Sequence, residues 1–199
     1  IVKFARSYPN AGYGGSFWSW IQSDVHKPYN SWGNGSAMRV SPVGFAFNDE
    51  ATVLKEAKKS AEVTHNHIEG IKGAQATALA IFLARIGKSK EEIKKRIEGD
   101  FNYDLNRSVD EIRPQYSFDV SCQGSVPESI ICFLDSMDYE DCIRNAVSLG
   151  GDADTMAAIA GDIAQAYYKA IPKFIVDEVY QVLPDEFIAI IERFEKVYG

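Results

Sequence analysis

The sequence predicts an all-α fold, a compact helical bundle that forms a single domain over residues 1–199. In almost every segment the apolar residues recur with a period of about 3.6, which is the main sequence signal for amphipathic helices. No convincing run alternates apolar and polar residues as a half-buried strand does, and the nearest candidate, Tyr116–Val120, is short. A chain of 199 residues with 46% hydrophobic residues is also long enough to bury one sizeable core.

The first half of the chain offers three well-marked helices. Residues 50–64 are amphipathic, with apolar side chains along one face. Residues 70–85 are rich in alanine, and Gly87 is a plausible C-cap for them. Ser89 then begins a short charged helix over residues 90–98, because the glutamate three residues after it can complete a capping box.

The second half contains further helical segments, and one of them includes a proline. Pro127 is expected in the first turn of its helix, where a missing N–H costs nothing. A helix rich in small residues follows Thr155. The other expected helices cover residues 125–136, 138–149, 173–182 and 185–197.

Residues 1–44 are the least regular part of the chain. The first six residues look like the end of a helix and do not begin with Met, so we expect an N-terminal segment to be missing. Residues 7–44 are rich in glycine and aromatic residues and are weakly helical. Long loops in a compact domain are usually functional or disordered, and the aromatic content argues against disorder.

Composition and cysteine usage exclude several classes of protein. A net charge of −7 without a basic block disfavours phosphate neutralisation on nucleic acid. No apolar run approaches the roughly 20 residues that cross a bilayer, and no signal peptide opens the chain, so we expect no membrane association. The three cysteines, Cys122, Cys132 and Cys142, fit neither a zinc pattern nor a disulfide framework. They are expected to be packing thiols in a reducing, cytoplasmic compartment.

The stretch Gly150–Thr155 places two aspartates and a threonine ahead of a helix. Asp154 stands where an N-cap residue is expected, because its oxygen can accept a hydrogen bond from the first turn. A cap explains one carboxylate, whereas Asp152, Asp154 and Thr155 together present three hard oxygen donors. Mg²⁺, Ca²⁺ and Mn²⁺ prefer such donors. The stretch therefore favours a metal site over the alternative of a capping residue beside a dipole-stabilised acid.

A glycine-bordered turn at Gly33–Ala37 runs into Met38 and opens a helix that Pro42 keeps short. Such a turn exposes backbone N–H groups at a positive dipole end, which suits a phosphate. An ordinary Gly-Asn-Gly turn explains the same residues equally well.

Two histidines, His65 and His67, lie between two predicted helices. Magnesium-type chemistry prefers oxygen ligands, and no cysteine is near them in sequence. We therefore expect these histidines to form hydrogen bonds rather than to bind metal.

Three motifs, taken in order, resemble the ADP-ribosylglycohydrolase family. They are Gly-Asn-Gly-Ser-Ala-Met-Arg-Val-Ser-Pro-Val-Gly at residues 33–44, Thr64-His65 followed by Gly70 and Gly73-Ala74, and Gly-Gly-Asp-Ala-Asp-Thr at residues 150–155. The resemblance spans nearly the whole chain, and the last motif with its small-residue helix is the most specific.

The resemblance implies a compact all-α fold with two magnesium ions in a cleft, manganese being a possible substitute. The implied reaction is hydrolysis of the bond that joins ribose C1″ of ADP-ribose to an acceptor, on an ADP-ribosylated protein or small molecule. An ADP-ribosylated nucleic acid is a less favoured substrate. Carried over by motif, Asp152 and Asp154 would be catalytic residues and metal ligands, and Thr155 a third metal ligand. The substrate-binding residues would be Gly33, Asn34, Gly35, Ser36, Ala37, Met38 and His65.

The resemblance also implies a nucleotide site near Ser121–Ser125, with Tyr116 or Phe118 as a ring that stacks on adenine. Two parts of the family pattern are not found in the 199 residues: an early Gly-Asp segment and a Thr-Asp-Asp motif, which supply other metal ligands and acidic residues. Three alternatives follow: a magnesium-dependent hydrolase, a catalytically incomplete relative that binds ADP-ribose or serves structurally, and a helical scaffold whose acidic turn is only a cap.

Overall fold

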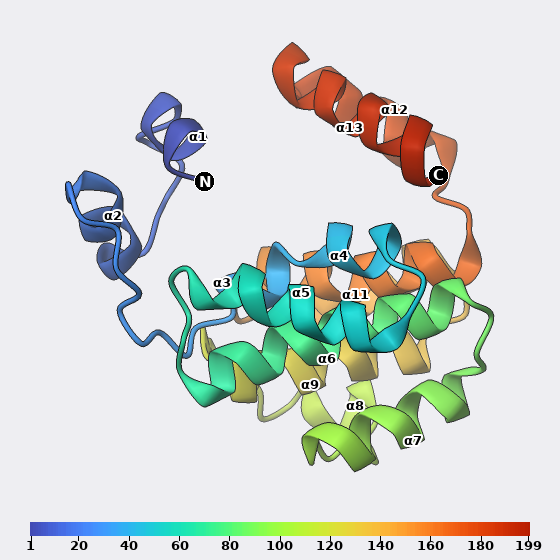
Figure 1. The fold of residues 1–199 in the computed structure, drawn as a ribbon. Helices are drawn as coiled ribbons and strands as arrows, with labels where there is room; N and C mark the ends of the chain where they lie inside the picture. Colours follow the sequence, from blue (N-terminus) through green and yellow to red (C-terminus); the bar gives the residue numbers. More distant parts are fainter.

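A computed structural model describes residues 1–199 as thirteen helices without a named strand, which confirms the all-α prediction (Figure 1). The helices are α1 Val2–Ser7, α2 Gly15–Gln22, α3 Gly35–Met38, α4 Ser41–Ala46, α5 Glu50–Glu62, α6 Ile68–Arg85, α7 Lys90–Phe101, α8 Val109–Ile112, α9 Cys122–Asp135, α10 Tyr139–Ser148, α11 Ala153–Tyr168, α12 Lys173–Val182 and α13 Asp185–Tyr198. None of them combines the length and the apolar character that crossing a bilayer requires.

Helix α6 is the centre of the bundle and packs against α3, α4, α5, α7, α9 and α11 (Figure 1). Its middle and end are apolar on every side, which is the pattern of a helix buried all round. Helix α9 approaches α6 closely at Gly73, which has no side chain: a Cβ on Gly73 would lie 2.5 Å from Sγ of Cys122. All three cysteines are free and buried, and burial raises the pKa of Cys122 and Cys142 to about 12. These properties agree with packing thiols.

The expected start of α9 was wrong. The helix begins at Cys122, because the side chain of Ser121 accepts a hydrogen bond from the N–H of Gly124 and caps it. Pro127 therefore lies inside the helix rather than in its first turn. The proline leaves the carbonyl four residues earlier, on the exposed Gln123, without its helical partner, and water can take that place.

Residues 7–44 contain more helix than the sequence predicts. Helix α2 begins at a glycine without a side-chain cap, so it lacks the usual start signal. Its Trp20 and Ile21 are buried with Ala5 in a small cluster separate from the main core, and Tyr13 and other aromatic side chains pack against it. Tertiary packing, rather than local propensity, explains this helix.

The helices at both ends of the chain stand away from the central bundle (Figure 1). Neither α12 nor α13 has a buried residue. Helix α1 meets α13 through the rings of Phe4 and Phe187, whose centroids are 5.6 Å apart. The Tyr8 hydroxyl also donates a hydrogen bond of 2.5 Å to Glu186.

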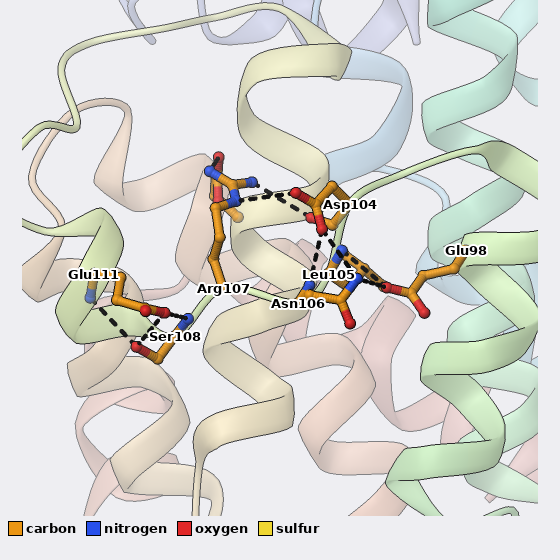
Figure 2. Close-up of polar contacts among 8 residues, drawn as sticks. Glu98, Asp104, Leu105, Asn106, Arg107, Ser108 and Glu111 are labelled. Carbon is orange, nitrogen blue, oxygen red and sulfur yellow. Dashed lines mark hydrogen bonds and ion pairs between the residues drawn. The ribbon is translucent and has the colours of Figure 1, made fainter.

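A polar loop between α7 and α8 covers one side of α9 (Figure 2). Glu98 accepts hydrogen bonds from the Leu105 N–H at 3.2 Å and from the Asn106 side chain at 2.9 Å. Arg107 of this loop forms an ion pair of 2.9 Å with Glu128 of α9. The Glu128 side chain is only 9% exposed, its Oε2 has no hydrogen-bond partner, and burial raises its pKa.

We expect Arg107→Ala to lower the free energy of unfolding by about 1–3 kcal/mol. Removing one partner of a buried ion pair costs about 3–5 kcal/mol, and the half-exposed arginine reduces that value. Adding Glu128→Gln should recover much of the loss, because the uncompensated buried charge is then gone. Urea denaturation of the single and double variants measures both effects. Equal stability of Arg107→Ala and the unmodified protein would contradict this interpretation.

Candidate functional site

The turn that leads into α3 is fixed to the segment before α9. The Asn34 N–H donates to the Val120 carbonyl at 2.8 Å, and the Cys122 N–H donates to the Trp32 carbonyl at 2.9 Å. Gly33 and Ser121 form an isolated β-bridge. This bridge is the only strand-like pairing, so Tyr116–Val120 is not a strand.

Asn34 joins this turn to the acidic stretch. Its side-chain N–H group donates to Asp152 Oδ2 at 2.7 Å and to Ser125 Oγ at 3.2 Å. Asn34 is 6% exposed, so these bonds satisfy an amide that is almost fully removed from water. Two regions far apart in sequence, both singled out from the sequence alone, therefore meet at one place.

The start of α11 differs from the prediction. Asp152, rather than Asp154, is the N-cap residue, and its side chain makes no capping hydrogen bond. Gly150 and Gly151 both have positive φ, at 74° and 67°, and turn the chain so that the helix begins at Ala153. Asp154 lies in the first turn, where its Oδ1 accepts a hydrogen bond of 2.9 Å from the Thr155 N–H.

Electrostatics at this helix start favour a positively charged ligand. Partial burial raises the pKa of Asp152, and the neighbouring Asp154 carboxylate raises it further. The hydrogen bond from the Asn34 amide opposes that rise. The crowding of two carboxylates is therefore only partly relieved by the protein itself, and a cation would relieve it further.

The donor set fits a hard divalent cation in part. Asp152 and Asp154 offer carboxylate oxygens, and the hydroxyl of Thr155, which is 8% exposed, has only the Met38 sulfur as an acceptor, at 3.6 Å. Sulfur is a weak acceptor, so this hydroxyl is free to turn toward a ligand. No group of three or more His, Cys, Asp or Glu side chains is placed to hold a metal. These three residues would therefore supply part of an octahedral shell, and water or the ligand the rest.

His65 lies beside the same turn. It is 6% exposed, and a Cβ placed on Gly35 would lie 3.3 Å from its Nε2. Its Nδ1 is 2.7 Å from the Thr64 hydroxyl oxygen. His67 instead caps α6, its Nδ1 accepting a hydrogen bond of 3.1 Å from the Glu69 N–H. Both histidines form hydrogen bonds, as the sequence predicts.

We expect His65 to stay neutral far below the pH at which an ordinary histidine becomes charged. Burial lowers its pKa to about 4, and the nearby Arg39 lowers it too. Between pH 6.5 and pH 4 the unfolded chain then binds a proton that the native state does not, so stability falls as the pH falls. The loss approaches about 3 kcal/mol at pH 4, at about 1.4 kcal/mol per pKa unit.

An NMR titration of the His65 ring measures its pKa directly. The His65→Gln variant should lose less stability than the unmodified protein between pH 7 and pH 4. A His65 pKa near that of a free histidine would contradict the expected environment.

Of the two rings expected beside the nucleotide, that of Tyr116 is engaged within the fold and that of Phe118 is exposed. The Tyr116 hydroxyl donates to the Gly124 carbonyl at 3.0 Å, and its ring packs against the core, so this side chain is already engaged. Phe118 is 69% exposed. The sequence interpretation missed Trp32, which is 54% exposed, directly precedes the glycine turn and meets the edge of His67. The position of a tryptophan next to Gly33 was the available signal.

Comparisons with known proteins identify the family of this chain and several relatives. The family model described as ADP-ribosylglycohydrolase matches residues 3–199. A human protein named ADP-ribosylhydrolase ARH3 is 31% identical to this chain, in a match that covers 83% of this chain and 63% of that protein. A Pseudomonas putida protein named ADP-ribosylarginine hydrolase Tri1 is 28% identical over 142 residues, covering 68% of this chain and 38% of that protein.

A solved structure described as an ADP-ribosylglycohydrolase-related protein complex has a similar fold. Its TM-score is 0.63 at 26% sequence identity, with 86% of this chain and 63% of that chain covered. The chain spans less than two thirds of the length of each of these relatives. The match of the family model over almost every residue shows that the chain belongs to the ADP-ribosylglycohydrolase family.

Proposed function

We propose that this protein hydrolyses the glycosidic bond between ribose C1″ of ADP-ribose and an acceptor, with the help of a divalent cation. The observation that carries the proposal is the hydrogen bond from Asn34 to Asp152. It joins the glycine turn, which would bind phosphate, to the start of α11, which would bind a cation. Family membership and the names of the relatives, one an ADP-ribosylhydrolase and one an ADP-ribosylarginine hydrolase, support the substrate class.

The diphosphate of ADP-ribose would lie against the turn from Gly33 to Met38. As the first residues of α3, Gly35 and Ser36 have N–H groups without an intrahelical acceptor. His65 Nε2 lies beside the same turn and adds a further polar atom. These contacts would be remote from the bond that breaks, so their binding energy would serve to position the ribose.

The adenine base would lie on exposed apolar side chains next to the turn. Trp32, Phe118 and Val120 are 54%, 69% and 51% exposed. Trp32 directly precedes the turn. Val120 lies beside it, because the Val120 carbonyl accepts a hydrogen bond from the Asn34 N–H. An exposed tryptophan offers a flat face on which a base can stack.

The cation would be held by Asp152, Asp154 and Thr155, with Mg²⁺ as the expected ion and Mn²⁺ as a substitute. When bound, such an ion would orient the ribose hydroxyls and lower the pKa of a water molecule. Asn34 holds Asp152 in place by the bond described above. Glycosidic cleavage develops positive charge at C1″, and the two aspartates would stabilise it electrostatically.

A second candidate function is ADP-ribose binding without hydrolysis. It is favoured by one observation: no group of three or more His, Cys, Asp or Glu side chains is placed to hold a metal. Such a protein would keep the turn, His65 and the small-residue helix, and would need no second metal site.

Hydrolysis assays on peptides ADP-ribosylated at serine and at arginine separate the two functions. The proposed enzyme releases free ADP-ribose from at least one of them, and EDTA stops the release. Binding of ADP-ribose without release from either peptide would favour the second function.

A further inference from the structure

A short chain of hydrogen bonds lies behind His65, on the side away from the turn. Arg39 donates through Nη2 to the Thr64 hydroxyl oxygen at 2.8 Å and to the Ser60 carbonyl at 3.0 Å. The Thr64 hydroxyl in turn lies 2.7 Å from His65 Nδ1. Thr64 is fully buried, so water cannot replace any of these contacts.

The hydrogen-bond donors around the Thr64 hydroxyl determine which ring nitrogen of His65 carries the proton. A guanidinium group has only donors, so Arg39 occupies an acceptor site of the Thr64 hydroxyl. If His65 Nδ1 carried the ring proton, it would also donate to this oxygen, and the hydroxyl proton would be left buried without an acceptor. An unsatisfied buried donor is unfavourable, so the hydroxyl donates to Nδ1. The donation from Arg39 strengthens this bond, because hydrogen bonds in a chain polarise one another.

With Nδ1 accepting, the proton of the neutral ring must be on Nε2. This atom faces the glycine turn, because added Cβ atoms on Gly33 and Gly35 would lie 3.6 Å and 3.3 Å from it. No protein atom accepts a hydrogen bond from Nε2, so its N–H is available to a ligand. The opposite tautomer would present a lone pair to that ligand and repel an anion.

We propose that Arg39 is a positioning residue that acts through the Thr64 hydroxyl to hold His65 in the neutral tautomer protonated at Nε2. His65 then presents one N–H donor to an anionic group in the Gly33–Met38 turn. The proposal deepens the proposed function, since it names how this turn selects a phosphate-bearing ligand. Arg39 itself need not touch that ligand.

The tautomer is measured in the ligand-free protein, by ¹⁵N NMR of the imidazole nitrogens at pH 7. A pyridine-type Nδ1 and a pyrrole-type, protonated Nε2 in His65 are expected. A protonated Nδ1 in the unmodified protein would overturn the proposal. This measurement does not depend on ADP-ribose binding, so it separates failure of the proposal from failure of the proposed function.

Variants test whether Thr64 and Arg39 set the tautomer. Thr64→Val keeps the shape of the side chain and removes the hydroxyl, whereas Thr64→Ser keeps the hydroxyl. Thr64→Val should change the tautomer population and weaken ADP-ribose binding by roughly tenfold, within the range of a hydrogen bond to a charged group. Thr64→Ser should restore both. Arg39→Lys keeps the charge without the paired N–H groups and should show an intermediate change; it also serves if Thr64→Val does not fold.

Adenosine is the matched control ligand, because it lacks phosphate. Its affinity should be the same for Thr64→Val and the unmodified protein, whereas a general disturbance of the pocket would weaken both ligands alike. Equal losses for adenosine and ADP-ribose, or an unchanged tautomer in Thr64→Val, would overturn the role given to Arg39 and Thr64.

Discussion

Asp152→Asn is expected to reduce Mg²⁺ affinity and Mg²⁺-dependent hydrolysis by roughly tenfold or more, since even partners outside the direct ligands of a metal typically contribute 10–100-fold. The asparagine keeps an oxygen that can accept the 2.7 Å bond from Asn34, so the local structure should survive. What disappears is one of two crowded negative charges beside Asp154. Isothermal calorimetry and the peptide assay measure the two losses.

The same substitution lowers Mg²⁺ affinity but should not lower the free energy of unfolding of the metal-free protein. The pKa of Asp152 is raised in the folded protein, so the native state holds a proton more tightly than the unfolded chain. Stability is therefore lost as the pH rises past that pKa, and Asp152→Asn lacks this loss. In EDTA at neutral pH the variant should be as stable as the unmodified protein, or more stable.

Asp152→Ala is the matched comparison. It removes the acceptor of the buried Asn34 amide as well as the charge, and an orphaned buried donor costs about 1–3 kcal/mol. A Mg²⁺ affinity of Asp152→Asn equal to that of the unmodified protein would contradict the metal assignment and favour a purely structural role for this residue.

Gly35→Ala is expected to weaken ADP-ribose binding by roughly tenfold, an effect of about 1.4 kcal/mol. The added methyl group would lie 3.3 Å from His65 Nε2 and 3.4 Å from its Cε1, at the place where the diphosphate is proposed to bind. Fluorescence of the neighbouring Trp32 during titration with ADP-ribose can report the affinity.

Gly99→Ala is the control for this substitution. Gly99 is inside α7, and nothing lies within 4 Å of its added Cβ. This change should leave ADP-ribose affinity unaltered and raise stability by about 0.5–1 kcal/mol, the ordinary helix preference for alanine. If Gly35→Ala binds ADP-ribose as tightly as Gly99→Ala does, the turn does not hold the diphosphate.

Much of the fold follows from local signals in the sequence. The helix at Lys90–Phe101 shows the capping box expected at Ser89, with its side chain and that of Glu92 both bonded to backbone N–H groups. The start and end of α12, at Lys173 and Val182, also agree with the prediction. In α7 periodicity and a capping box act together, whereas α12 has no side-chain cap and follows from its helical period and the prolines that flank it.

The observed helices differ from the predicted ones where contacts between residues distant in sequence determine the structure. Helix α2 has no capping residue and depends on Trp20 packing against Ala5. Helix α11 begins at Ala153 because two successive glycines turn the chain with positive φ, which the sequence allows but does not require. Neither outcome can be read from the local pattern alone.

The candidate site was likewise predictable in its residue types but not in its contacts. Its residue types were predicted from oxygen donors and a glycine turn, and the structure brings those two segments together. The bond between Asn34 and Asp152 joins residues whose proximity depends on the packing of α3 and α11, so spacing in the sequence could not reveal it. The roles of Asp152, Asp154, Thr155 and His65 in catalysis or binding stay predictions.

Titration of ADP-ribose into the protein by calorimetry, once with excess Mg²⁺ and once with EDTA, tests the central claim most directly. The proposed site predicts binding with Mg²⁺ and a marked loss of affinity in EDTA, because Asp152 and Asp154 need a cation to accept the ribose of an anionic ligand. Equal affinity in both conditions, or no binding in either, would contradict it.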